Sequence, residues 1–267
     1  MIFDSDDLYD LERAKWLLEN PGLAAKLTDL LGTPIERGFE MLPQNWKERV
    51  GSITTAALSK AVTAAVNTLK NEPCCQSSNF LHKIAVGTTG GIGGFFGLGA
   101  LAIELPISTT IMFRSIADIA RSEGELISTT EVQLACMEVF AFGGLKSSND
   151  AHESAYFAAR AALASSLSKA AEFIAQKGLI EGSPAIIRFI LQISERFSVQ
   201  VSEKAISQAI PAIGAAGGAI INTLFIDHFQ DIARGHFTVR RLERKYGKEI
   251  VENAYAILEP SKDILNN

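Results

Sequence analysis

The chain has 267 residues, a length that fits one large or two small domains, and 47% of them are hydrophobic, which is enough to bury a substantial core. Its 30 acidic and 25 basic residues give a net charge of −5. A chain this acidic is not expected to bind nucleic acid in general, because contacts with phosphates require a basic surface. The three cysteines do not form a disulfide framework and suit a reducing compartment.

Apolar residues at helical spacing predict helices along most of the chain. We expect helices at 6–19, 46–69, 107–121, 130–142, 150–177, 184–208, 217–246 and 248–258, with short segments at 23–31 and 34–42. Pro106 is expected to precede a helix, Asp150 to open one, and Ser183 with Pro184 to start another. No segment alternates polar and apolar residues as a strand does, so the sequence predicts an all-α fold.

Two segments without any charged residue stand out, Ile84–Ile103 with 20 residues and Ala205–Ile226 with 22. Either one is long enough to span a bilayer. Their Gly, Ala and polar residues make insertion marginal, because each strongly apolar residue contributes only about 0.3–0.6 kcal/mol. Three alternatives remain open: stable spanning, association with a membrane surface, and burial as a helical hairpin in a soluble core.

Glycines four residues apart occur in both uncharged segments. Residues at this spacing share one helix face, so a second helix can approach them closely. Each such glycine costs about 1 kcal/mol in helix propensity, which packing must offset. The glycines expected at close helix contacts are Gly87, Gly90, Gly91, Gly94, Gly97, Gly214 and Gly218.

Known catalytic, nucleotide and metal motifs are missing or weak. The stretch 87–94 has the spacing G-x-x-x-G-x-G, but no strands surround it, no acidic residue follows at about twenty positions, and no Gly-Lys-Ser/Thr completes a phosphate loop. No hydrolase elbow or zinc-protease motif occurs, and Cys74, Cys75 and His82 lack a second ligand pair at zinc spacing. We therefore expect no cofactor, no metal and no catalytic residues.

A basic stretch follows the second uncharged segment. Four basic residues lie on one helix face there, namely Arg241, Arg244, Lys245 and Lys248. Such a face can contact anionic lipid headgroups, at about 1 kcal/mol for each basic residue near the surface. The alternative is a helix face that is merely solvated.

The tetrapeptide Asp-Ile-Ala-Arg occurs twice, at 118–121 and at 231–234, each time after a Gly-rich apolar stretch. A duplicated unit and a chance similarity between two helices both explain it.

Several separated motifs resemble the EcsC family, bacterial proteins named for a member encoded beside an ABC transporter. They are Gly87–Gly97, Glu104–Pro106, Arg114–Ala117, Glu138–Gly144, the grouping of Asp150, Tyr156 and Arg160, Gly214–Asn222, Ala233, His236–Phe237 and Arg240–Glu243. The similarity covers about residues 46–258. It implies a helical protein linked by gene context to transport or the membrane, and it carries no agreed catalytic residues.

We therefore expect an N-terminal helical extension (1–45), an EcsC-like all-α domain (46–258) and a C-terminal tail (259–267). The two Gly-rich segments are expected to pack together. The start of the chain shows no cleaved signal peptide, so the expected location is the cytoplasm, at the inner face of the membrane. The predicted function is a non-enzymatic helical protein that acts on a membrane surface or a membrane transport protein.

The alternative function is a soluble helical protein with an apolar pocket for a lipid-like ligand, or a hydrolase with polar residues at the rim of such a pocket. The candidate rim residues are Glu104, Arg114, Glu138, Asn222 and His236.

Overall fold

The computed structural model describes residues 3–19, 22–32, 35, 44–68, 98–144, 154–180, 182–209 and 214–258. Every regular element in these ranges is an α-helix, which confirms the predicted all-α class. The helices are α1 (Ser5–Glu19), α2 (Leu23–Leu31), α4 (Trp46–Thr68), α6 (Leu98–Ser122), α7 (Thr130–Phe142), α8 (Ala155–Lys177), α9 (Pro184–Ala209), α10 (Gly214–Tyr246) and α11 (Lys248–Ile257).

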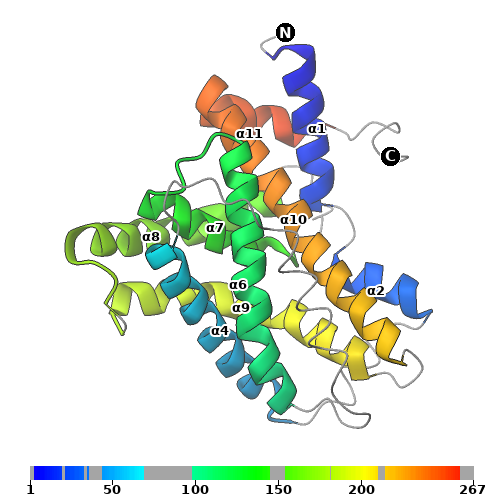
Figure 1. Ribbon diagram of the computed structural model, residues 1–267. Helices are drawn as coiled ribbons and strands as arrows, with labels where there is room; N and C mark the ends of the chain where they lie inside the picture. The colour runs from blue at the N-terminus through cyan, green and yellow to red at the C-terminus, as the bar shows by residue number, and fades with distance from the viewer. Residues whose placement is uncertain are drawn as a thin grey trace.

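The longest helix, α10, runs through the molecule from one end to the other (Figure 1). Its 33 residues correspond to a length of about 50 Å. Helices α1 and α11 pack near its C-terminal end, α2 packs nearer its start, and α6 and α4 lie side by side along the bundle. The end where α10 begins is therefore far from the end where the chain's first and last helices gather.

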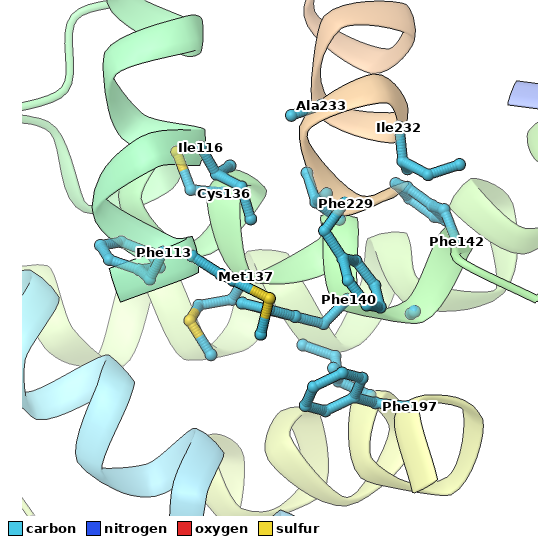
Figure 2. Close-up of a cluster of buried hydrophobic side chains, with 14 of the residues drawn as sticks. Phe113, Ile116, Cys136, Met137, Phe140, Phe142, Phe197, Phe229, Ile232 and Ala233 are labelled. Carbon is cyan, nitrogen blue, oxygen red and sulfur yellow. The ribbon is translucent and has the colours of Figure 1, made fainter. Parts of the chain in front are cut away.

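The core surrounds α7, whose residues 132–142 are all buried. Helices on several sides cover it, because α4, α6, α8, α9 and α10 all pack against α7. Figure 2 shows Phe140 of α7 between Phe229 of α10 and Phe197 of α9. The centroid of the Phe140 ring lies 5.4 Å from that of Phe229 and 4.9 Å from that of Phe197. This central helix brings side chains from α8, α9 and α10 into one cluster.

Helix α6 differs from its prediction at its start. It begins at Leu98 rather than after Pro106, and the proline lies inside the helix. A proline in a helix interior removes one hydrogen bond and costs about 3 kcal/mol. Leu101 and Leu105, in the turns before Pro106, are buried in the core, and this packing favours continuing the helix through the proline.

Helix α8 also starts later than predicted. Its N-cap is Ser154, whose side chain accepts a hydrogen bond from the backbone of Tyr156, and Asp150 lies outside the described residues. The other predicted ends agree closely with the structure. Thr129 caps α7, and Pro184 is the first residue of α9.

The duplicated tetrapeptide forms the same local ion pair in two helices that pack together. Arg121 Nη1 lies 3.1 Å from Asp118 Oδ1 in α6, and Arg234 Nη1 lies 2.8 Å from Asp231 Oδ1 in α10.

The glycines predicted at helix contacts are mostly outside the described residues: Gly87, Gly90, Gly91, Gly94 and Gly97. Gly214 is the first residue of α10, and no described atom lies within 4 Å of the position that a Cβ of Gly218 would occupy. Among the glycines that the structure describes, Gly235 lies at a close helix contact, where a Cβ would be 2.9 Å from the carbonyl oxygen of Ala14. This glycine lets α1 contact the backbone of α10.

Helix α1 shares the core with the rest of the bundle. Its buried residues Leu11, Ala14 and Leu18 belong to the same hydrophobic cluster as those of α7 and α10. The boundary expected at residue 45 stays a prediction.

None of the helices in the described ranges has the length and hydropathy needed to cross a bilayer.

Candidate functional site

Three helices each contribute two residues, four positions apart, to one buried region: Glu138 and Phe142 from α7, Tyr156 and Arg160 from α8, and His236 and Arg240 from α10. Residues at this spacing lie on the same helix face, one turn apart. The region therefore has an aromatic layer, with Phe142, Tyr156 and His236, beside a layer of charged side chains. We call the group of Glu138, Tyr156, Arg160, His236 and Arg240, with the arginines' partners Glu125 and Glu243, the buried polar centre.

The aromatic layer holds His236 in place. The Tyr156 hydroxyl lies 2.8 Å from His236 Nδ1, and the Phe142 ring centroid lies 5.1 Å from that of His236. Burial, together with the charges of Arg160 and Arg240, moves the pKa of His236 well below its usual value, so the imidazole is neutral. Its Nε2 atom is buried and has no hydrogen-bond partner among the described residues.

Each arginine of the charged layer is bound by one glutamate. Arg160 donates to both carboxylate oxygens of Glu243 at 2.8 and 2.9 Å, and Arg240 donates to those of Glu125 at 2.7 and 3.3 Å. Such paired bonds fix the plane of the guanidinium group as well as its position. Glu125 lies in the turn between α6 and α7, so the two ion pairs tie α10 to α8 and to this turn.

Glu138 is the unpaired member of the centre. It is 5% exposed and accepts no hydrogen bond from any described residue. Burial raises the pKa of this carboxyl to about 7, although the charges of Arg160 and Arg240 act in the opposite direction. The centre therefore contains an acid that exchanges its proton near neutral pH.

A second cluster of charges joins α1 to the end of α10. Arg241 donates to Asp7 at 3.0 Å, to Asp10, and to Glu123 at 2.8 Å. Lys245 donates to Asp7 and, at 3.0 Å, to Asp4. We call this group, with Arg244 and Tyr246, the α1–α10 charge network.

Within this network, the pKa of Asp7 is lowered to about 2, chiefly by the hydrogen bond from Lys245 and further by those from Tyr246 and Arg241. Arg244 donates to Glu125 and to the backbone carbonyl of Glu123. Three of the four basic residues predicted to meet lipid headgroups thus have acidic partners in the protein itself. Lys248 is exposed and has no partner among the described residues.

The five predicted rim residues do not line one cleft. Glu138 and His236 meet in the buried polar centre, whereas Arg114 is exposed on α6. Glu104 accepts from Lys204 at 2.6 Å, and Asn222 accepts from Gln208 at 3.1 Å. Asn222 and His236 are 14 residues apart on α10, or about 21 Å. Glu104 and Arg114 lie on either side of Pro106 in one continuous helix, and the carboxylate of Glu104 pairs with Lys204.

Exposed isoleucines occur near Glu104 and Asn222 along the chain. Lys204 and Gln208 lie one turn apart on α9, so they bring the starts of α6 and α10 together at the end of α9. Ile103 is 72% exposed, Ile107 49% and Ile220 48%. All three adjoin or belong to the two uncharged segments. We call these isoleucines the apolar end of the bundle; they belong to the first turns of α6 and α10, which lie away from α1 and α11 (Figure 1).

An open groove of about 1400 Å³ runs between α4 and α9. Its lining includes Trp46, Thr55, Leu191, Ser194 and Val199. The hydroxyl groups are already partnered in part, since Thr55 and Ser194 bond to each other at 2.8 Å and Trp46 donates to Ser202. None of the predicted rim residues lines this groove, and its described lining contains no histidine or cysteine.

The comparison with protein families identifies the family to which the chain belongs. The sequence matches the model of the EcsC protein family over residues 15–242. The chain belongs to the EcsC protein family. No curated protein and no solved structure matches the sequence. In this EcsC protein, the matched region contains most of the buried polar centre, whereas Asp4, Asp7, Lys245 and Tyr246 of the charge network lie outside it.

The motifs that carried the family resemblance meet in space. Glu138, Tyr156, Arg160, His236 and Arg240 come from four of these motifs, on three helices, and form one centre. Sequence reasoning selected Glu138 and His236 but missed both arginines and Tyr156 as site residues. The spacing of four residues on each predicted helix was the signal that could have found them.

Proposed function

We propose that this EcsC protein is a non-enzymatic accessory protein that binds a membrane surface through its apolar end, on the cytoplasmic side. The exposure of Ile103, Ile107 and Ile220 is the observation that carries the proposal. An exposed apolar surface is typical of interaction sites, and these three isoleucines belong to or adjoin both uncharged segments of the chain. The link of the EcsC family to a transporter gene, implied by the resemblance, supports the same location.

The positions of the charges favour the apolar end over the basic helix as the contact. Ile220 and Arg241 are 21 residues apart on α10, or about 30 Å, so a membrane that meets one is far from the other. Arg241, Arg244 and Lys245 are also occupied by carboxylates, whose bonds would have to break before lipid could bind. We therefore propose that membrane binding depends on apolar contact and only weakly on salt.

Flotation with vesicles of phosphatidylcholine and phosphatidylglycerol tests the proposal. The wild-type protein should float with the vesicles at low and at high salt. The double variant Ile103→Asp/Ile107→Asp should stay at the bottom, because two carboxylates would then face the hydrocarbon. Both positions are exposed, so the variant should keep the helical circular dichroism of the wild type.

The matched control is Leu126→Asp, which changes a 68% exposed leucine in the turn after α6, near the opposite end of the bundle. This variant should float like the wild type. A wild-type protein that never floats would show that it does not bind lipid directly, and a membrane protein partner would then be sought with the same variants. Loss of flotation at high salt only would show that the basic residues make the contact.

A further inference from the structure

Glu138 is a buried carboxyl without a hydrogen-bond partner among the described residues, in the same charged layer as two arginines that already have carboxylate partners. A guanidinium group has five N–H donors, and in the bidentate pairs each arginine uses only two of them on its glutamate. Each arginine therefore has N–H groups left that can donate to a carboxylate other than that of its present partner. They are also the two positive charges that act on Glu138.

The two arginines differ in what happens to their partners if they move. Glu243 accepts only from Arg160 among the described residues, so this glutamate would be left unpaired. Glu125 accepts from Arg240 and also from Arg244. Since leaving a buried carboxylate unpaired is costly, Arg240 can turn away at a lower cost than Arg160.

We propose that Glu138 is a proton-controlled switch: when its carboxyl group releases a proton to solvent, Arg240 turns from Glu125 toward Glu138, and Glu125 keeps Arg244 alone. When Glu138 is protonated it is neutral, and Arg160 stays paired with Glu243 and Arg240 with Glu125. The ionised state draws Arg240 inward because a buried carboxylate needs a charged hydrogen-bond donor. The change reaches the turn at 123–127 through Glu125.

The other groups around Glu138 keep a constant charge near neutral pH. From α8, burial raises the pKa of the Tyr156 hydroxyl, which stays protonated, and Arg160 stays positive. From α10, His236 stays neutral. On α7 itself, the exposed Glu131 adds a negative charge that favours the protonated form of Glu138. No charge from α4 or α9, as far as the structure describes them, acts on this carboxyl.

Carboxyl carbon NMR of the wild-type protein gives the first test. One glutamate should titrate with a midpoint near 7, far above the usual value of about 4.3 for glutamate, and this signal should be absent from Glu138→Gln. Arg240→Gln should move the midpoint higher, because it removes a positive charge. If every carboxyl in the wild type titrates below about pH 5.5, the proposal is wrong, and this result needs no variant to fold.

Amide hydrogen exchange at the turn tests the movement of Arg240. The Glu125 amide donates to the carbonyl of Ala120 at 3.0 Å, so its exchange reports how firmly the turn is held. After correction for the intrinsic pH dependence, exchange at Glu125 should become several-fold faster between about pH 6 and pH 8 in the wild type. It should stay constant in Glu138→Gln.

The matched control is Glu131→Gln, which neutralises an exposed glutamate on the same helix and should retain the wild-type change in exchange. Equal exchange at both pH values in the wild type would contradict the movement of Arg240, whatever the titration of Glu138. These measurements need no membrane and are therefore independent of the proposed function.

Discussion

Arg241 Nη1, near the end of α10, lies 3.0 Å from Asp7 Oδ1 in the first turn of α1, although the two residues are 234 positions apart in the chain. Asp7 is buried, with a side chain that is 7% exposed, and Arg241 also contacts Asp10 and Glu123. This basic residue therefore joins α1 and the turn after α6 to α10.

We predict that Arg241→Gln lowers the free energy of unfolding by about 1–2 kcal/mol, because it removes several ion pairs, one of them to a buried carboxylate. Urea denaturation at neutral pH measures this change. Arg234→Gln is the control, since Arg234 is more exposed, and its ion pair joins it to Asp231 on its own helix; it should cost less than about 0.5 kcal/mol. A stable Arg241 variant that no longer floats with vesicles would instead assign the residue to lipid binding.

Asp7 also sets how the protein responds to acid. Its pKa is about 2 in the folded protein and 3.8 as an ordinary aspartate, so the unfolded state binds the proton more readily. The stabilisation is present above about pH 3.8 and is lost as the pH falls through about 2. We predict that Asp7→Asn is less stable than the wild type at neutral pH and loses less further stability over this acid range. Urea midpoints measured across the range test this, with Asp6→Asn as the control because Asp6 is exposed.

Gly235 should tolerate no side chain. A Cβ at this position would lie 2.7 Å from Leu18 Cγ and 2.9 Å from the carbonyl oxygen of Ala14, and the backbone atom cannot move away alone. We predict that Gly235→Ala lowers the free energy of unfolding by about 1–3 kcal/mol. Gly51→Ala should instead raise the free energy of unfolding.

Gly51 is the matched control because it lies inside α4 and a Cβ there would meet no atom within 4 Å. Alanine favours a helix over glycine by about 0.5–1 kcal/mol, so this variant should be more stable than the wild type. Thermal melting of both variants gives the comparison. A normal melting temperature for Gly235→Ala would show that α1 is not packed closely on α10.

The helices could be predicted where the signals are local. Thr129 before α7 and Pro184 at the start of α9 act within a few residues, and both boundaries agree with the structure. Pro106 is also a local signal, but it gave the wrong start for α6 because the burial of Leu101 and Leu105 depends on other helices. Local patterns therefore predicted where the helices lie. They did not predict that packing extends α6 through a proline, a residue that disfavours a helix.

The candidate site could be predicted only in part for the same reason. Glu138 and His236 were selected by residue type, and the structure places both in the buried polar centre. The partners of the basic helix were not found, because Asp7 and Arg241 meet only after α1 has packed on α10. A cluster of like charges in a sequence contains no information about distant residues that neutralise it.

The first and last described helices both pack near the C-terminal end of α10, on the side of the α1–α10 charge network (Figure 1). A purification tag or fluorescent protein joined before α1 or after α11 would therefore be attached near this end. When the protein is immobilised on a sensor through either terminus, the isoleucines at positions 103, 107 and 220 would lie away from the attachment point and be accessible to injected vesicles.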